Sequence, residues 1–166
     1  IWVDIFDRWG LDVAKKNLKN IDFVKIPPTV ILDEKLVNEI MKLNLPTAIG
    51  VGGYEDDDID FVLSKINKFN NQIILMYGFQ AFPTPVEDST IGRIPYLRKK
   101  YKHTLGYADH TEGGSDMSFL LPQYAFFAGA QIIEKHIILD RSKKGFDYYS
   151  SLEPNEFKLF VKKMKQ

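Results

Sequence analysis

The chain has 166 residues, of which 45% are hydrophobic and 27% charged, and 22 basic side chains are balanced by 22 acidic ones. This length and composition predict one globular domain over residues 1–166, with no electrostatic reason for a nucleic-acid partner and no apolar run of the ~18 residues that a membrane span needs. The sequence has no cysteine, which excludes disulfides and thiolate metal sites and favours a cytoplasmic location.

Six short apolar runs alternate with six longer segments of helical spacing. The runs predict strands at 1–6, 23–28, 47–51, 73–78, 104–109 and 131–137. The remaining segments predict helices at 9–19, 34–43, 56–69, 90–101, 116–128 and 153–165. In the third helix, Ile59, Val62 and Ile66 share one face behind an acidic first turn, which complements the helix dipole. Strand and helix units that alternate in this way predict parallel strands joined by crossover helices.

Two α/β architectures fit this alternation. A doubly wound sheet would carry a glycine-rich phosphate turn, but GVGGYEDD at 50–57 lacks the G-x-G-x-x-G spacing and runs into acidic residues. A (β/α)8 TIM barrel fits better, because its polar residues gather where strands end, as do Lys25, Gln80, His110 and His136. The chain holds about six of the eight βα units, so we expect a partial barrel that lacks its first two units.

The stretch QIIEKHI carries three ionisable residues in a predicted buried strand. Because side chains alternate along a strand, Glu134 and His136 face one side, the barrel interior, and Lys135 faces the helices outside. Asp109 and His110 end the preceding strand, and adjacent strands lie about 4.8 Å apart. His110 and His136 are therefore candidate ligands of one divalent cation, with Glu134 or Asp109 fixing the imidazole tautomer. The alternative is a pair of structural histidines.

Other polar and aromatic residues leave two interpretations open. Lys25 lies in an apolar strand and either reaches the surface or points into the barrel mouth as an anion ligand. Phe146, Tyr148 and Tyr149 surround Asp147 in sequence, and they either line a sugar-binding mouth or pack against the protein.

Four sequence blocks closely resemble one family. FVKIPP, FPTPVED, GYADHTEGG and GAQIIEKHIILDRSKKGFDYYSSLEPNEF are similar, in register, to motifs of the catalytic barrel of the N-acetylneuraminate (sialic acid) synthase family. The resemblance runs over nearly the whole chain and covers strands three to eight of that barrel. It implies that the first two βα units and the family's small C-terminal antifreeze-like domain are absent from this chain.

The resemblance implies an enzyme that condenses phosphoenolpyruvate with an N-acetylhexosamine-type aldehyde, such as N-acetylmannosamine, to a nine-carbon 2-keto sugar acid. A Mn²⁺ or Mg²⁺ ion would polarise the aldehyde. By position, His110 and His136 match the metal ligands, Glu134 the acid beside them, Asp147 a sugar-contacting residue and Lys25 a phosphate-binding lysine. The resemblance thus makes Glu134 and Lys25 the catalytic candidates.

Further positions complete the expected site. Gln80, Phe82 and Asp109 stand where the family pattern has substrate-binding residues. We expect small-molecule substrates, no nucleic-acid or membrane partner, and a homodimer.

The chain departs from the family pattern mainly where phosphate would bind. Pro28 and Ala108 replace serines, Gly50-Val51-Gly52 stands for S-T-G, and Phe82 replaces a tyrosine. Each hydroxyl lost from a phosphate site removes a charge-assisted hydrogen bond worth roughly 1.5–3 kcal/mol, and Asp4 would repel the anion. The alternative function is therefore a barrel that has lost phosphoenolpyruvate chemistry and acts as a sugar- or metal-binding or scaffold module in a surface-polysaccharide pathway.

Overall fold

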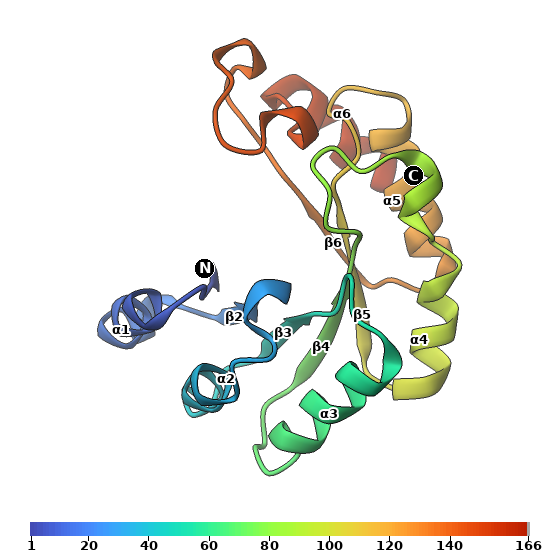
Figure 1. The fold of residues 1–166 in the computed structure, drawn as a ribbon. Helices are drawn as coiled ribbons and strands as arrows, with labels where there is room; N and C mark the ends of the chain where they lie inside the picture. The colour runs from blue at the N-terminus through green and yellow to red at the C-terminus, as the bar shows by residue number, and fades with distance from the viewer. Residues whose placement is uncertain (166) are drawn as a thin grey trace. The chain divides into compact units, whose positions relative to one another are not determined.

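Strands and helices alternate along the chain in the computed structural model, which describes residues 1–165 (Figure 1). The strands are β1 (Trp2–Asp4), β2 (Phe23–Ile26), β3 (Thr47–Gly50), β4 (Ile73–Tyr77), β5 (Thr104–Asp109) and β6 (Ile132–Lys135). The α-helices are α1 (Arg8–Lys16), α2 (Glu34–Met41), α3 (Asp56–Ile66), α4 (Arg93–Tyr101), α5 (Met117–Ala128) and α6 (Pro154–Met164). All the strands and helices expected from the sequence are therefore confirmed; most are shorter than expected, β5 has the expected bounds, and α1 begins one residue earlier.

Short 3₁₀ helices occupy several of the connections. They are η1 (Leu18–Asn20), η2 (Pro28–Val30), η3 (Val86–Ser89), η4 (Arg141–Lys143) and η5 (Tyr148–Ser150). The last two lie in the long segment between β6 and α6, which also contains Asp147.

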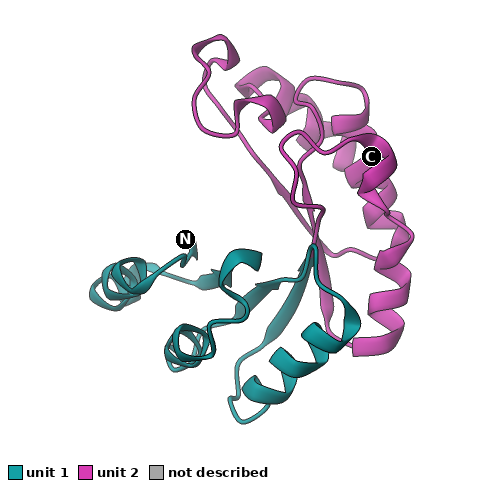
Figure 2. Cartoon of the chain, viewed as in Figure 1, with its two compact units in different colours: residues 1–76 teal, residues 77–166 magenta. Residues whose placement is uncertain are grey.

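The chain divides into two compact units, residues 1–76 and the part that begins at Tyr77 (teal and magenta in Figure 2). The division falls at the end of β4, so that Tyr77 is the last residue of that strand and the first of the second unit. The first unit contains β1 to β3, most of β4 and helices α1 to α3, and the second contains β5, β6 and helices α4 to α6.

Parallel strands form the centre of the first unit, in the order β1-β2-β3-β4. The register sets Asp4 beside Lys25 and Lys25 beside Ala48. Helix α2 packs against β2 and against its neighbours α1 and α3. Apolar side chains from strands and helices together fill the core of this unit, among them Ile5, Leu11, Val24, Ile26, Leu36, Ile40, Ile49, Ile59 and Leu75.

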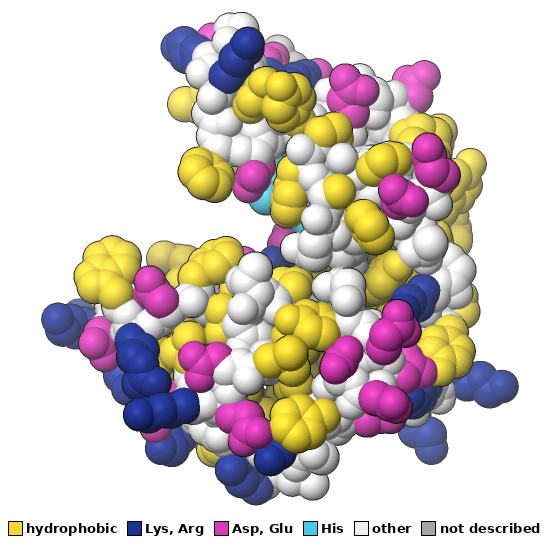
Figure 3. Space-filling model, in the orientation of Figure 1, with side chains coloured by type: hydrophobic (Ala, Val, Ile, Leu, Met, Phe, Trp, Pro, Cys, Tyr) yellow, Lys and Arg dark blue, Asp and Glu magenta, His cyan; other side chains and the backbone are white. Residues whose placement is uncertain are grey.

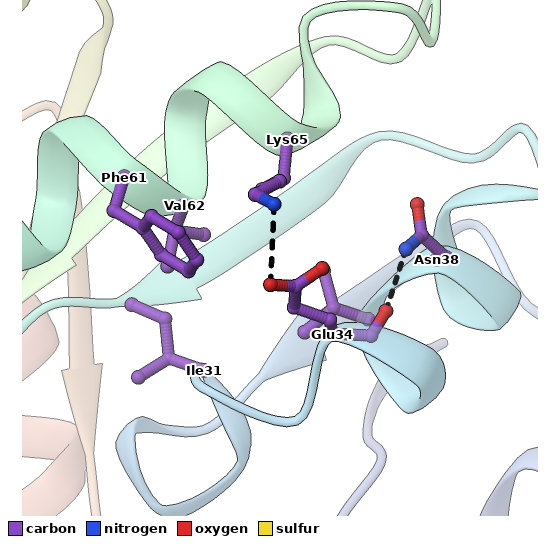
Figure 4. A pocket seen from close by; sticks show the side chains of 7 residues that line it. Ile31, Glu34, Asn38, Phe61, Val62 and Lys65 are labelled. Carbon is purple, nitrogen blue, oxygen red and sulfur yellow. Dashed lines mark hydrogen bonds and ion pairs between the residues drawn. The ribbon is translucent and has the colours of Figure 1, made fainter.

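A small pocket marks the junction of α2 and α3 (Figure 4). Ile31 and Phe61 form part of its apolar wall, and Lys65 Nζ lies 3.2 Å from Glu34 Oε1 across it. Asn38 Nδ2 donates a hydrogen bond of 2.7 Å to the carbonyl oxygen of Glu34. The Lys65–Glu34 ion pair joins the two helices, whereas the Asn38 hydrogen bond lies within α2.

The second unit is built on the parallel pair β5 and β6, in which Ala108 lies beside Glu134 and Asp109 beside Lys135. Helix α5 packs on both strands and contacts α4 and α6. Phe119, Leu152 and Phe160 form a buried cluster that joins α5, α6 and the segment before α6. The α/β class is confirmed, and the strand pairs within each unit are parallel, whereas the eight-unit barrel stays a prediction.

Helix α6 begins at a fixed position because its sequence supplies a complete N-terminal cap. The Glu153 side chain accepts from the backbone of Glu156, the Glu156 side chain accepts from the backbone N–H of Glu153, and Pro154 opens the first turn.

Basic and acidic side chains are mixed over the visible face of the molecule (Figure 3), in line with the zero net charge. Among the described residues, no helix is long and apolar enough to cross a membrane.

Candidate functional site

Two histidines directly follow the two neighbouring strands of the second unit. His110 comes after β5 and His136 after β6, and their ring centroids lie 5.4 Å apart. Parallel strands end at the same edge of a sheet, so their register brings both imidazoles to one place. The sequence predicted this proximity from the spacing of the two motifs.

His110 has a defined orientation. Its Nδ1–H donates a hydrogen bond of 2.7 Å to the carbonyl oxygen of Phe79, so Nε2 carries the free lone pair of the neutral ring. Burial lowers the pKa of His110 below the usual 6.5, and the charge of His136 acts in the same direction, although the Phe79 hydrogen bond and nearby carboxylates oppose it. The ring is therefore held as a neutral nitrogen donor, which is the form that binds a metal ion.

The acceptor that fixes the His110 tautomer differs from the expected one. We predicted a carboxylate, Glu134 or Asp109, whereas the acceptor is a backbone carbonyl from the segment after β4. The His110 carbonyl oxygen in turn accepts from the Thr84 backbone N–H at 2.8 Å and from Ser150 Oγ at 2.7 Å. Two segments of the second unit, the one after β4 and the one after β6, thus hold this one residue.

The lowered pKa of His110 predicts a pH dependence with a definite sign. As pH falls below about 6.5, the unfolded chain takes up the proton before the folded chain, so stability decreases until the lowered folded pKa is reached. We expect His110→Gln to flatten this decrease. Burial also lowers the pKa of His103. The variant His103→Gln makes the same chemical change at another histidine and is compared with His110→Gln. Ring NMR titration and urea unfolding at about pH 7.5 and 5.5 measure the effect; an imidazole of His110 that titrates above 6.5 would contradict it.

Phe82 covers the two imidazoles. Its ring centroid lies 4.4 Å from that of His110 in a tilted arrangement and 5.6 Å from that of His136 edge to face. The peptide bond between Phe82 and Pro83 is cis. Gln80, in contrast, donates from Nε2 to the carbonyl oxygen of Gly78 at 3.0 Å and so turns towards its own loop.

His136 faces the carboxylate of Asp147. The His136 Nδ1 and Asp147 Oδ2 atoms are 3.6 Å apart, which is an ion-pair distance and too long for a hydrogen bond. Both side chains are about one-third exposed. Glu134 also lies close enough to His110 to raise its pKa electrostatically. The expected residues His110, Glu134, His136 and Asp147 therefore lie in one part of the second unit.

Asp109 lies behind this group, in a fully buried ion pair with Lys135. The Asp109 side chain is 0% exposed and that of Lys135 1% exposed, and Lys135 Nζ donates to Asp109 Oδ2. Thr111 Oγ1 donates to both carboxylate oxygens, at 3.0 and 2.8 Å, and the Tyr107 hydroxyl donates to Oδ1 at 3.2 Å. We expected Asp109 to bind substrate. Its burial and its three partners favour a structural role, and substrate binding by Asp109 stays a prediction.

Lys25 belongs to the first unit and is paired with Asp4. Lys25 Nζ lies 3.2 Å from Asp4 Oδ2, and the lysine side chain is mostly buried. Lys25 is therefore not a surface lysine of the β2 strand. The sequence indicated Asp4 as a repulsive charge, but it did not indicate that the two residues are register partners.

Three comparisons relate this arrangement to known proteins, and the first decides the family. Residues 5–166 match the family model described as NeuB family. The chain belongs to the NeuB family. A pseudaminic acid synthase of Campylobacter jejuni is 34% identical over 136 residues, which are 81% of this chain and 38% of that protein. The N-acetylneuraminate-9-phosphate synthase of Drosophila melanogaster is 29% identical over 141 residues, 84% of this chain and 37% of that protein.

A solved structure supports the same assignment. The N-acetylneuraminic acid (sialic acid) synthetase of Leptospira borgpetersenii, crystallised with citrate, superposes with a TM-score of 0.88 at 27% identity and covers 98% of this chain. The NeuB-family chain spans 54% of that protein and about two fifths of the curated relatives. The three relatives described above are sugar acid synthases, and the chain matches part of each.

Proposed function

We propose that this chain is part of a sugar acid synthase that condenses phosphoenolpyruvate with an N-acetylhexosamine-type aldehyde. The enol carbon of phosphoenolpyruvate bonds to the aldehyde carbon, water adds to the adjacent carbon, and phosphate leaves, which gives a nine-carbon 2-keto sugar acid. The observation that carries the proposal is the histidine pair, in which the Phe79 carbonyl oxygen orients His110 and leaves its Nε2 available.

A divalent cation fits the residues of this site. The buried neutral ring of His110 and the adjacent ring of His136 supply two nitrogen donors. The described residues contain no cluster of three or more histidine, aspartate or glutamate side chains arranged as a metal site, so substrate and water oxygens would complete the shell. Nitrogen donors suit a transition metal such as Mn²⁺ better than Mg²⁺, which prefers oxygen. When bound, the ion would polarise the sugar aldehyde.

The protein side chains around the pair have separate roles. Asp147, about one-third exposed beside His136, accepts hydrogen bonds from sugar hydroxyls. Glu134, which acts electrostatically on His110, is the candidate to move a proton at the reacting carbon or its oxygen. Phe82 packs over both imidazoles and keeps water away from one side of them. Gln80 lies in the same loop as Phe82 and contributes to substrate contact.

The proposal also includes the assembly and location of the protein, which works as a cytoplasmic homodimer.

The pairing of Lys25 with Asp4 supports a second candidate function. In the synthase proposal Lys25 binds the phosphate of phosphoenolpyruvate, but a carboxylate 3.2 Å from its Nζ opposes an anion there. Together with the lost hydroxyls, this favours a protein that keeps the metal and sugar site and no longer uses phosphoenolpyruvate.

One experiment separates the two functions. The full-length protein that contains this chain is incubated with Mn²⁺, phosphoenolpyruvate and a panel of N-acetylated hexoses, and phosphate release and product mass are measured. The synthase proposal predicts one phosphate released for each keto acid formed, and loss of both with chelator. Binding of Mn²⁺ or sugar in calorimetry, with no phosphoenolpyruvate binding and no turnover on any sugar, would favour the second candidate.

A further inference from the structure

Arg141, the first residue of η4, joins the segment after β6 to the start of α6. Its Nη1 and Nη2 donate to the two carboxylate oxygens of Glu156, at 2.9 and 2.6 Å, and Nη1 also donates to the Ser151 carbonyl oxygen at 3.0 Å. The Arg141 backbone N–H donates to Glu153 Oε1 at 2.9 Å. A two-point arginine–carboxylate contact fixes angle as well as distance, which a single contact does not do.

The loop after β5 lies directly against this contact. A Cβ atom on Gly113 would lie 2.0 Å from the Ser151 carbonyl oxygen and 3.0 Å from Arg141 Nη1. A Cβ atom on Gly114, whose φ is +78°, would lie 2.6 Å from Glu156 Oε1 and 2.8 Å from Arg141 Nη2. Only glycine leaves room for so close an approach. The two loops are therefore packed backbone to side chain.

Hydrogen bonds extend from this packing to the candidate site. The Gly113 N–H donates to the Tyr149 carbonyl oxygen at 2.7 Å, next to Ser150, which donates to the carbonyl oxygen of His110. Two further bonds reach the rest of the site. Ser151 Oγ donates to the Asp147 carbonyl oxygen at 2.9 Å, and the Leu152 N–H donates to the His136 carbonyl oxygen at 2.9 Å. Residues 150–152 thus contact all three site residues that lie after the strands, His110, His136 and Asp147.

We propose that Arg141 is a positioning residue for this site. Arg141 fixes residues 147–152 between α6 and the loop that contains Gly113 and Gly114. In this way Arg141 sets the separation of the two imidazoles and places the Asp147 carboxylate beside His136. Arg141 itself touches neither imidazole in the contacts described above, so its effect passes through Ser151 and the loop backbone. This inference rests on the proposed metal and sugar site.

The test compares variants of the full-length protein. Arg141→Gln removes the two-point contact, Arg141→Lys keeps the charge without the fork, and Glu156→Gln removes the partner charge. Lys143→Gln is the matched control, because Lys143 is in the same 3₁₀ helix and its side chain is 80% exposed. Gly113→Ala leaves all charges in place and separates the two loops sterically.

Three readouts are measured on each protein: Mn²⁺ binding, hydrogen exchange and steady-state kinetics with the sugar. Binding of Mn²⁺ alone is followed by electron paramagnetic resonance of the free ion, and hydrogen exchange is measured over residues 110–116 and 147–152. We expect Arg141→Gln and Gly113→Ala to bind Mn²⁺ about 10–100-fold more weakly and to exchange faster in both segments, with partial recovery in Arg141→Lys. Lys143→Gln should match the wild type. Sugar KM should rise more than kcat falls, because Asp147 is displaced.

The outcomes distinguish this inference from the proposed function. Unchanged Mn²⁺ affinity and unchanged exchange in Arg141→Gln and in Gly113→Ala would overturn the positioning role. If the wild type binds no Mn²⁺, the metal proposal fails, and the exchange of the Gly113 amide still decides whether Arg141 holds the loop. If Arg141→Gln does not fold, Arg141→Lys and Gly113→Ala are used to decide, with wild-type unfolding midpoints required for both.

Discussion

Replacing Lys135 with methionine is expected to lower the free energy of unfolding by about 3–5 kcal/mol, because it leaves the Asp109 carboxylate buried without its cationic partner. The two side chains are 1% and 0% exposed, so water does not replace the lost ammonium group. Thr111 and Tyr107 still donate to the carboxylate, but neutral hydroxyls do not compensate a full charge.

A double variant shows whether the lone charge causes the loss. Lys135→Met with Asp109→Asn removes both charges and keeps an oxygen to accept from Thr111 and Tyr107, so we expect most of the stability to return. Lys143→Met, at a largely exposed lysine, is the control and should change stability little.

The measurement has to report on the second unit. Both tryptophans, Trp2 and Trp9, lie in the first unit, so their fluorescence follows the other part of the chain. Urea unfolding is therefore followed by hydrogen exchange of β5 and β6 together with circular dichroism. Equal destabilisation in the single and double variants would contradict the proposed cause, since the lone charge would then have no separate effect.

Replacing His136 with alanine is expected to lower Mn²⁺-dependent turnover by more than about 100-fold, beyond the 10–100-fold effects typical of residues that only support a metal ligand. The reason is that the proposed metal site, with two imidazole donors, would lose half of its protein ligands. Mn²⁺ affinity, measured by calorimetry on the full-length protein, should fall in parallel.

His103 provides the control for this substitution. It precedes β5, at the opposite end of the strand from His110, so His103→Ala removes an imidazole without touching the pair. We expect His103→Ala to keep wild-type turnover and Mn²⁺ affinity. A His136→Ala protein that retains full metal-dependent turnover would exclude His136 as a ligand.

The sequence was sufficient to predict the strands and helices and the proximity of the two candidate histidines. Alternating apolar runs and helical spacing located the strands and helices, because those patterns follow from which faces are buried. The proximity of His110 and His136 followed from one rule, that neighbouring parallel strands end at the same edge. Strand alternation predicts opposite directions for Glu134 and Lys135; in the structure Glu134 acts electrostatically on His110, and Lys135 is buried against Asp109.

Other contacts of the site had no sequence signal of their own. The acceptor of His110 Nδ1–H is the backbone oxygen of Phe79, and a carbonyl oxygen is present at any residue. The pairing of Asp109 with Lys135, and of Asp4 with Lys25, depends on strand register, which requires the three-dimensional alignment of two segments. The two glycines of HTEGG were the one visible sign of the close approach to Arg141.

The backbone carbonyl oxygen of His110 joins two loops and so limits changes in their length. It accepts from Thr84 in the loop after β4 and from Ser150 in the segment after β6, so neither loop can gain or lose residues near these contacts without moving the other. Phe146, whose side chain is 98% exposed, lies outside this constraint. Redesign of these loops should therefore exchange side chains at exposed tips and preserve the loop lengths.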